Sequence, residues 1–581
     1  MESLLTLFPA TLDADVNVRR SAELELRKLE GQPGMLAASF QLITAEGVDL
    51  SVRQAASIYV KNRIATGWDA PPSRTDSGRT RVPDEDRAPV RSALLTTIAS
   101  VPEPLRVHVA SAINGIARCD FPDAWPSLLQ EINMLLAQPK EEQVYAGVRA
   151  LLEVVRAFRF SDPDTKLESI VAQTFPQLLQ TTRALLDSPH TSLPQVGEIV
   201  YYALKTYKTS MVVTLTEHQR SAESIVPWGT VMLRVVQKPL EQDPAAAQDP
   251  DAHAKTPWWG AKKWAFFSLN KLFSRYGNPS QLAPSLKSYK PFAENFIAQF
   301  APEILRAYLH VVERVLGEGV WVSKPVTRSL LLFFAECVKA KAMWSELRPH
   351  IRQLIEAYVY PLLCFSDADA ELWELDPIDF VRSRADPIED DGQPSSAARQ
   401  LLGIAVAKRT KTAFEPTLHF ITSVLNAYPG SCTPRQKDGA LAMCITIAVT
   451  MVNSEQVQDM LEAFFVQHVL PELKSEHAFL RLRACEMVQT FDHAGMKWHT
   501  GEGLEGAFRG VMDCIMDGEL PVRVAAAQAI GELIAHDEVH NAMAPNAGRL
   551  MQELLKLSDE TDMDVLMACL LYTSPSPRDR G

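Results

Sequence analysis

Cysteine and long apolar runs are both scarce in this chain. The eight cysteines among 581 residues are scattered, and no Cys-x-x-Cys pair occurs. Several, such as Cys337 and Cys444, lie within apolar helical patterns, so we expect free, mostly buried thiols in a reducing compartment. No apolar run reaches the roughly 18 residues that suggest a membrane span. The first residues, MESLLTLFPATLDAD, also lack the pattern of a secretory signal.

Positive charge is in deficit. The chain has 58 Lys and Arg against 71 Asp and Glu, for a formal net charge of −13. Direct DNA or RNA binding usually needs a basic face, so we expect no direct nucleic-acid partner. The lack of a spanning apolar run predicts no membrane partner. An acidic balance fits basic protein partners better.

Recognisable catalytic motifs are missing as well. The sequence contains no GxxxxGK[ST], no GxGxxG after a strand, no GxSxG and no HExxH. Lone histidines beside an acid, such as His477 and His540, indicate surface residues rather than metal ligands. We therefore expect no enzyme, no cofactor and no metal site.

Helical periodicity is present throughout. Apolar residues recur at i, i+3, i+4 and i+7 in segments of roughly 12 to 25 residues, without a convincing strand. The segments form pairs, and several second helices open alike, with VDLSVRQAASIYV at 48–60, HAFLRLRACEMV at 477–488 and GELPVRVAAAQAI at 518–530. The predicted fold is all-α, a right-handed superhelical solenoid of about 11–12 HEAT-type antiparallel helix pairs of roughly 40 residues each.

The helix expected at 50–64 shows how such a pair would be used. On a helical wheel its broad apolar side carries Val52, Ala55, Ala56, Ile58 and Tyr59. The narrow polar side carries Arg53, Gln54, Ser57 and Lys61. We expect the apolar side to be core. The polar side is either solvated surface or, if successive helices line one wall, part of a binding strip.

Polar segments interrupt the pattern at 69–84, 241–256 and 366–391. The third reads SDADAELWELDPIDFVRSRADPIEDD, with ten carboxylates against two arginines. Insertions in repeat arrays map to loops and often to the binding face, so an acidic inter-helix loop is predicted over 366–394.

The apolar residues of this insertion set it apart from a plain solubility tract. Trp373, Ile378 and Phe380 could fix part of it to the wall. Carboxylates that remain free would then contact a basic partner. The candidates are Asp386, Glu389, Asp390 and Asp391. A solvated loop without a role is the alternative.

An aromatic block, PWWGAKKWAFFSLNKLFSRYG, occupies 257–277. Aromatic rings interleaved with lysines can hold single-stranded nucleic acid. The helical spacing of Trp264, Phe267 and Lys271 instead favours a helix that is apolar nearly all round and buried between its neighbours.

Several ordered blocks resemble one known family. RRSAELELRKLEGQPGMLAASFQLI followed by VDLSVRQAASIYVKNRI resembles the importin-β N-terminal domain, and ARCDFPDAW resembles that family's I-x-x-x-D-[FY]-P-x-x-W element. The block at 257–277, the acidic insertion with SSAARQLL after it, and RQKDGALAM are similar to the importin-seven and importin-eight branch and its fungal counterparts. The resemblance extends to about residue 568.

The resemblance implies a nuclear import receptor. Such a receptor binds basic cargo (ribosomal proteins, histones) in the cytoplasm, crosses the pore by contacts with Phe-Gly nucleoporins and releases cargo on binding Ran-GTP. It would shuttle as a monomer between cytoplasm and nucleus. Importin-β is a further implied partner, through a C-terminal half beyond this chain. Two rivals stay open: a helical-repeat scaffold that never binds Ran, and an export receptor of the same superfamily.

The resemblance also implies positions for Ran-GTP contacts. These are polar residues on the second helices of the first pairs, namely Arg53, Lys61, Asn62, Asn114 and Arg118. Asp120 and Trp125 are assigned instead to the inter-helix turn and the core.

The expected domain organisation follows from the same blocks. Ran-binding repeats are expected over 1–130, central repeats over 131–365, the acidic loop over 366–394 and further repeats over 395–568. The last segment, 569–581, departs from the family and is expected to be a non-native tail. The chain is thus expected to be a truncated N-terminal half, with an uncapped and sticky C-terminal end.

Overall fold

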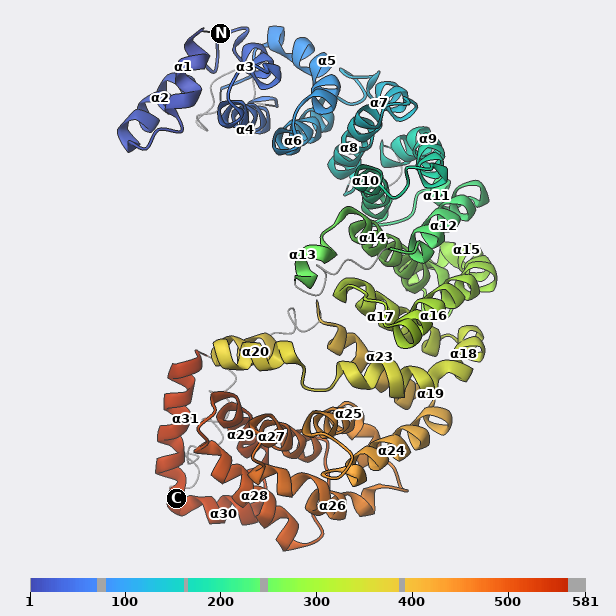
Figure 1. Ribbon diagram of the computed structural model, residues 1–581, viewed down its shortest axis with the longest axis vertical. Coiled ribbons are helices and arrows are strands. Elements are labelled where there is room, and N and C mark those ends of the chain that lie inside the picture. The colour runs from blue at the N-terminus through green and yellow to red at the C-terminus, as the bar shows by residue number, and fades with distance from the viewer. Residues whose placement is uncertain (1, 70–79, 161–165, 241–248, 386–391, 563–581) are drawn as a thin grey trace. The chain divides into compact units, whose positions relative to one another are not determined.

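A computed structural model describes residues 2–69, 80–160, 166–240, 249–385 and 392–562. Within these ranges every regular element is a helix and no strand occurs (Figure 1), which confirms the all-α prediction. None of the described helices has the length and apolar character needed to cross a bilayer. The chain divides into two compact units, Met1–Leu272 and Phe273–Gly581.

The N-terminal unit is built from consecutive helix pairs. They are α1 with α2, α3 with α4, α5 with α6, α7 with α8, α9 with α10, and α12 with α14. From α4 onward the second helices pack on one another in order and line the inner side of this curved unit (Figure 1). The bounds are α1 Glu2–Ala10, α2 Val16–Leu29, α3 Met35–Thr44, α4 Leu50–Gly67, α5 Asp84–Ser100, α6 Glu103–Asp120, α7 Leu128–Leu136, α8 Glu141–Phe158, α9 Lys166–Asp187, α10 Pro194–Ser210, α11 Glu217–Arg220, α12 Ala222–Gln237, α13 Pro250–Ala254 and α14 Pro257–Lys271.

The C-terminal unit repeats the plan, but several first helices are broken into α, 3₁₀ and π segments. The second helices α17, α23, α25, α27 and α29 pack on one another in sequence. The bounds are η2 Leu272–Gly277 (starting at the unit boundary), η3 Pro284–Tyr289, α15 Lys290–Asn295, η4 Phe296–Phe300, α16 Ala301–Glu318, α17 Lys324–Lys339, α18 Lys341–Leu347, η5 Arg348–His350, α19 Ile351–Gln353, η6 Leu354–Val359, η7 Tyr360–Leu362, α20 Asp367–Leu375, α21 Pro377–Ala385, α23 Pro394–Lys408, α24 Thr410–Ala427, α25 Pro434–Val452, η8 Gln458–Met460, α26 Leu461–Phe464, η9 Phe465–Val469, η10 Leu470–Lys474, α27 Ala478–His493, α28 Gly501–Ile515, α29 Leu520–Leu533, α30 Asp537–Met543, η11 Ala544–Asn546 and α31 Ala547–Thr561.

Small residues set how closely the second helices approach. A Cβ atom on Gly197 of α10 would lie 2.8 Å from the Trp258 ring, and one on Gly260 of α14 would lie 2.7 Å from the Tyr201 ring. Real Cβ atoms do not make contacts this short. Glycine at both positions therefore lets aromatic rings fill the space between α10 and α14.

The aromatic block is helical, and most of it is core. Trp258, Trp259 and Phe266 of α14 are buried, which confirms the packing interpretation for them. Phe267, however, is 37% exposed, and Trp264 is only half-buried. One side of α14 therefore faces outward instead of being covered by its neighbours.

The wheel drawn for α4 is wrong in part. Arg53 and Ser57 of the expected polar side are buried, whereas Ile58 of the expected core side is 37% exposed. The reason is tertiary. Helix α3 packs on α4 from the side that carries Arg53, where the Arg53 guanidinium donates to the Ile43 carbonyl.

The predicted acidic loop is also corrected, because residues 367–375 and 377–385 are helical. Ser366 caps α20 in a capping box with Asp369, and Asp376 accepts a hydrogen bond from the Asp379 amide at the start of α21. Two of the carboxylates that interrupt the apolar pattern, Asp369 and Asp376, thus stabilise helix N-termini, where acids are favoured by the helix dipole. Residues 386–391 and 563–581 lie outside the described ranges.

Candidate partner-binding surfaces

Arg53, predicted to contact Ran-GTP, is held inside the N-terminal unit. Its side chain is 7% exposed, and its Nε donates to the Ile43 carbonyl oxygen at 2.9 Å. This hydrogen bond satisfies a carbonyl at the end of α3, where helices leave acceptors unpaired. The structure therefore gives Arg53 a packing role between α3 and α4.

The other four predicted residues lie on the neighbouring second helices α4 and α6. Asn62 and Arg118 are exposed, and Lys61 is half-buried. Asn114 donates from Nδ2 to the Glu153 carbonyl of α8 at 3.0 Å, so its amide helps hold α6 to α8. Lys61, Asn62 and Arg118 are the members of the set whose polar groups reach the surface.

Asp120 and Trp125 have the structural roles expected of them. The Asp120 carboxylate accepts from the Trp68 indole at 3.0 Å and from Arg91 at 2.5 Å. The Trp125 amide donates to the Asp120 carbonyl, and the Trp125 ring is buried. These contacts fix the turn after α6, and with it the end of the helix that carries Arg118.

In the C-terminal unit, the acidic insertion is docked on helices far along the chain. The Trp373 indole of α20 donates to Glu519, at the start of α29, at 2.9 Å. Arg382 of α21 donates twice to the Thr561 carbonyl at the end of α31, at 3.0 and 2.7 Å. The expectation that apolar residues fix the insertion is confirmed for Trp373 and Phe380, which are buried, while Ile378 is half-buried.

A buried ion-pair network holds the start of this insertion. Asp438 of α25 accepts from Arg483 of α27 at 2.8 Å and from the Phe365 amide at 2.9 Å. Arg483 also pairs with Glu486, which in turn pairs with Arg384 at the end of α21. Burial raises the pKa of Asp438 despite Arg483. Burial also acts to raise the pKa of Glu486, but Arg483 and Arg384 outweigh it and lower that pKa.

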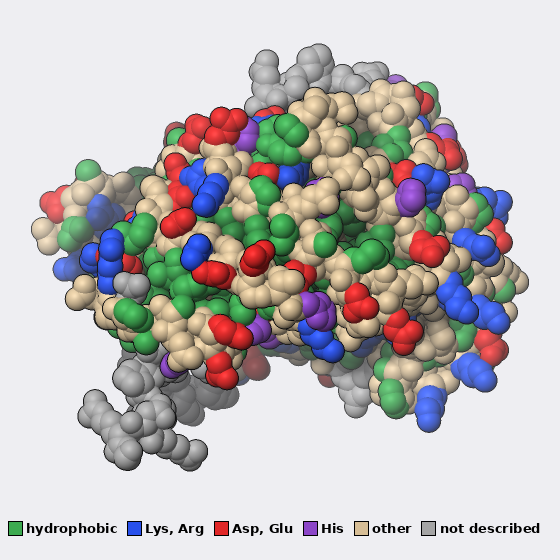
Figure 2. Space-filling view, turned by 90° about the horizontal axis from the view of Figure 1, so that it is seen from below, with side chains coloured by type: hydrophobic (Ala, Val, Ile, Leu, Met, Phe, Trp, Pro, Cys, Tyr) green, Lys and Arg blue, Asp and Glu red, His purple; other side chains and the backbone are tan. Residues whose placement is uncertain are grey.

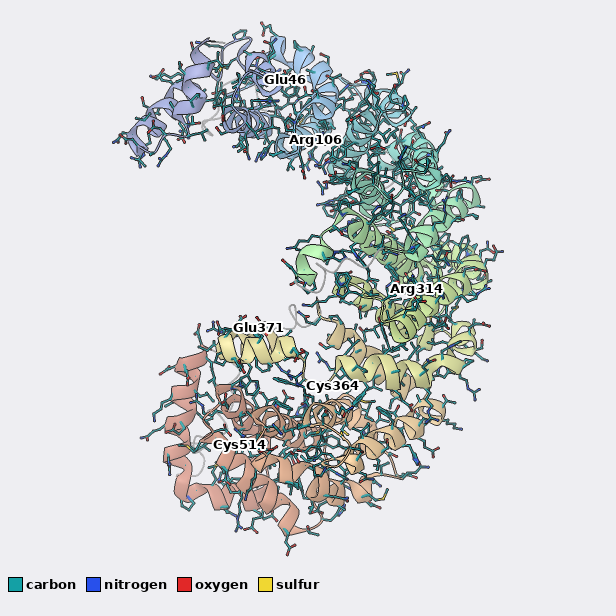
Figure 3. The ribbon with its side chains drawn as sticks, in the orientation of Figure 1. Glu46, Arg106, Arg314, Cys364, Glu371 and Cys514 are labelled. Atoms are coloured by element: carbon teal, nitrogen blue, oxygen red, sulfur yellow. The ribbon has the colours of Figure 1, made fainter. Side chains whose placement is uncertain are left out.

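Several carboxylates of the docked helices stay exposed. Glu371 and Glu374 of α20 and Asp379 of α21 are exposed and have no ion pair among the described residues; Glu371 is labelled in Figure 3. The docking contacts hold their backbone in place, so they form a fixed acidic surface. The predicted acids Asp386, Glu389, Asp390 and Asp391 fall outside the described residues. Glu371, Glu374 and Asp379 belong to the same stretch of sequence. They would have been candidates as well if that stretch had been predicted to form helices.

Grooves with exposed apolar side chains lie between adjacent first helices. In the N-terminal unit, one groove between α9 and α12 is lined by Phe175, Pro176, Leu179 and Trp228, among others. In the C-terminal unit, a groove of mixed character is lined by Trp498, Leu504, Phe508 and Val539 together with polar residues such as Lys497, Glu505 and Glu538. Figure 2 looks onto the end of the C-terminal unit, where apolar surface lies between charged side chains. Sequence periodicity could not single out these grooves, because their residues also read as ordinary core.

No group of His, Cys, Asp and Glu side chains within the described ranges has an arrangement suited to a metal ion. The candidate surfaces of the described residues are therefore polar strips on second helices, a fixed acidic insertion and grooves between first helices. These are features for binding other proteins.

Comparison with known proteins identifies the family. The importin-beta N-terminal domain matches residues 22–100, and the Cse1 domain matches residues 321–507. The chain is 30% identical over 584 residues to nonsense-mediated mRNA decay protein 5 of Saccharomyces cerevisiae, and 28% identical over 561 residues to importin-8 of Mus musculus. The chain belongs to the importin-β superfamily of nuclear transport receptors. These matches cover 97% and 95% of this chain but 55% and 54% of the relatives, so the chain spans about half their length.

Solved structures of this superfamily share the fold of the chain. The exportin Cse1 in its cargo-free, cytoplasmic state matches with a TM-score of 0.68 at 17% identity, over 98% of this chain and 61% of that one. The Kap95:Nup1 complex matches with a TM-score of 0.62 at 15% identity, over 100% and 62%. Kap121p bound to RanGTP matches with a TM-score of 0.53 at 15% identity, over 99% and 52%. These likenesses confirm the predicted HEAT-type helical array.

Proposed function

We propose that this importin-β superfamily chain is part of a nuclear import receptor. It binds basic cargo such as ribosomal proteins or histones in the cytoplasm, passes the pore through Phe-Gly nucleoporins, and releases cargo when Ran-GTP binds. On this proposal it is a shuttling monomer without enzyme activity. Support comes from the importin-8 similarity, and from related structures that hold RanGTP or Nup1.

The observation that carries the proposal is the fixed acidic surface of α20 and α21. Its exposed carboxylates, Glu371, Glu374 and Asp379, are set on a rigid base by Trp373 and Arg382. An acidic surface attracts basic proteins and accelerates their association. Both basic cargo and basic regions of Ran are suitable partners for it.

The proposed Ran-GTP surface, in the N-terminal unit, consists of Lys61, Asn62 and Arg118 on α4 and α6. These three present polar groups to solvent, while Arg53 and Asn114 serve the packing of the same helices. A pull-down with Ran loaded with GTP or GDP tests the assignment. We expect selective binding of the GTP form. Equal binding of both forms, or none, would favour the scaffold without a Ran site.

An export receptor is the second candidate. The match of the Cse1 domain to residues 321–507 and the similarity to the exportin Cse1 favour it. The two candidates differ in whether Ran-GTP weakens or strengthens the binding of cargo. An import receptor loses cargo when Ran-GTP binds, whereas an export receptor binds cargo more tightly in its presence.

We assign Phe-Gly binding to the grooves between first helices, because a phenylalanine ring needs an apolar slot open to solvent. Phe508 of α28 is half-buried in one groove, and Leu179 of α9 is half-buried in the other. Replacing both by Ala is expected to weaken binding of a Phe-Gly repeat peptide by roughly tenfold or more, since each truncation removes about 1–2 kcal/mol of apolar contact. Fluorescence anisotropy with a labelled peptide measures it.

The matched control replaces Met516 and Val466 by Ala. Both are exposed apolar residues outside the two grooves. That variant removes a similar apolar area and is expected to bind like the wild type. If the control loses as much affinity as the groove variant, the grooves are not the site.

A further inference from the structure

The second helices of the N-terminal unit carry a surface of opposite charge to the chain as a whole. Cationic side chains come from four successive second helices, α6, α8, α10 and α14, and from Arg159, which directly follows α8. The members of this basic strip are Arg118, Arg156, Arg159, Lys205, Lys208 and Lys263. All of them are exposed or half-buried, in a chain whose formal net charge is −13.

Aromatic rings fix several of these cations in place. The Lys208 ammonium lies 5.1 Å from the centre of the Trp264 ring and 5.3 Å from that of Phe267, and Lys263 lies 5.2 Å from Trp264. The Arg159 guanidinium lies 4.7 Å from the ring of Phe160, whose side chain is 69% exposed. Cation–π contacts of this kind reduce the freedom of long side chains. The positive charges are therefore held in position before a partner arrives.

The strip is not neutralised from within. Among the described residues, one member of the strip forms an ion pair: Arg156 pairs with Glu153 at 2.5 Å. The Nε of Arg159 is buried and has no hydrogen-bond partner. Burial lowers the pKa of Lys208, and Arg159, Lys205, Arg156 and Lys263 lower it further, so these groups are close enough to repel one another. A bound anion would relieve this repulsion.

One end of the strip is also hollowed. Arg118, Arg156 and Arg159 line a shallow pocket with Phe158, Phe160 and Lys166, at the C-terminal ends of α6 and α8. Cations around an exposed aromatic ring suit a peptide that alternates acidic and apolar side chains.

The position of the Trp264 ring argues against single-stranded nucleic acid as the occupant. Bases need open aromatic faces on which to stack. The Trp264 ring is instead approached by Lys208 and Lys263. The net charge of −13 also disfavours a long polyphosphate.

We propose that the basic strip binds an extended, Asp- and Glu-rich segment of a partner protein. Three steps between adjacent helices, each about 8–10 Å, span about 25–30 Å, which corresponds to roughly eight or nine residues of extended peptide. This partner class is opposite in charge to the basic cargo proposed above. The inference goes beyond that function and requires neither Ran nor cargo.

The test uses the full chain and a labelled ten-residue peptide of alternating Glu and Phe or Leu, against the same peptide with Gln for Glu. We expect the acidic peptide to bind more tightly, with an affinity that falls as salt rises. The Lys208→Gln/Lys263→Gln variant should weaken it roughly five- to tenfold, since each solvent-accessible charge contact contributes about 0.2–1 kcal/mol. Lys208→Arg/Lys263→Arg should retain binding, which separates a charge effect from a folding defect.

The matched control is Lys287→Gln/Lys290→Gln, which removes the same charge from exposed positions of the C-terminal unit. It is expected to bind the acidic peptide as the wild type does. Equal weakening in both double variants, or no preference for Glu over Gln, would overturn the proposal. Tighter binding of a single-stranded oligonucleotide than of the peptide would also overturn it, in favour of a nucleic-acid site.

Discussion

Replacing Asp438 by Ala is expected to lower the free energy of unfolding of the C-terminal unit by about 3 kcal/mol. Asp438 is 1% exposed, and its carboxylate is shared by the Arg483 guanidinium and the Phe365 amide. Its removal leaves a buried cation short of one partner and a buried amide unsatisfied, which costs more than the pair itself contributes. The effect lies near the lower end of the range for such pairs, because Glu486 still contacts Arg483.

Urea unfolding measures the loss, and hydrogen exchange at α25 and α27 locates it. The control is Asp367→Asn, which breaks an ion pair with Arg435 whose side chains are 93% and 44% exposed. That change is expected to cost less than about 1 kcal/mol, because solvent screens exposed pairs. If Asp438→Ala costs no more than the control, the buried network does not hold the base of the insertion.

Neutralising the helical acids of the insertion is expected to weaken basic-cargo or Ran-GTP binding roughly tenfold at low salt. The variant is Glu371→Gln/Glu374→Gln/Asp379→Asn. Each exposed charge contact contributes about 0.2–1 kcal/mol, and their sum falls as salt screens it. A second variant that neutralises Asp386, Glu389, Asp390 and Asp391 is expected to add to the loss. Surface plasmon resonance at two ionic strengths would measure association and dissociation separately, with the larger effect on association.

The control for charge alone is Glu303→Gln/Glu313→Gln/Glu318→Gln on α16, which removes three exposed acids from a first helix of the same unit. It should leave both affinities within about twofold of the wild type, because the changed charges lie outside the acidic surface. Unchanged binding in both insertion variants at low ionic strength would return the insertion to a solvated segment without a role in binding.

The helix pairs could be predicted because the period of apolar residues defines them. The side of each helix that its neighbours bury could not be predicted in the same way. Arg53 and Ser57 lie on the polar side of the α4 wheel, yet both are buried, and Arg53 donates to the Ile43 carbonyl of α3. A wheel records one helix and carries no information about which neighbour packs on which side. The same limit applies to Asn114, whose side-chain amide donates a hydrogen bond to the Glu153 carbonyl of α8.

The insertion shows a different limit. Helices α20 and α21 are each nine residues long, too short to be stable alone in water. They depend on contacts with residues far along the chain, such as Glu519 and Thr561. The sequence did indicate the anchors, because Trp373 and Phe380 are out of place in a soluble tract. It could not supply their docking partners.

The basic strip could not be recognised from the sequence, for a related reason. Its members come from helices spread between Arg118 and Lys263, and each lysine or arginine alone reads as an ordinary surface residue. Only the aromatic block hinted at it, and the buried rings of Trp258 and Phe266 made the packing interpretation correct for most of that helix. The outward position of Phe267 became visible once α10 and α14 were placed together.

The most direct test of the import proposal is the coupling between Ran-GTP and cargo. A linker histone, as a basic probe, is bound to the chain, and its dissociation constant is measured at increasing Ran-GTP. We expect the histone to bind at least about fivefold more weakly at saturating Ran-GTP, with Ran-GTP weakened by the same factor in the presence of histone, because linkage is reciprocal. Ran-GDP should have no such effect. Histone binding that is unchanged or tightened by Ran-GTP would contradict the account.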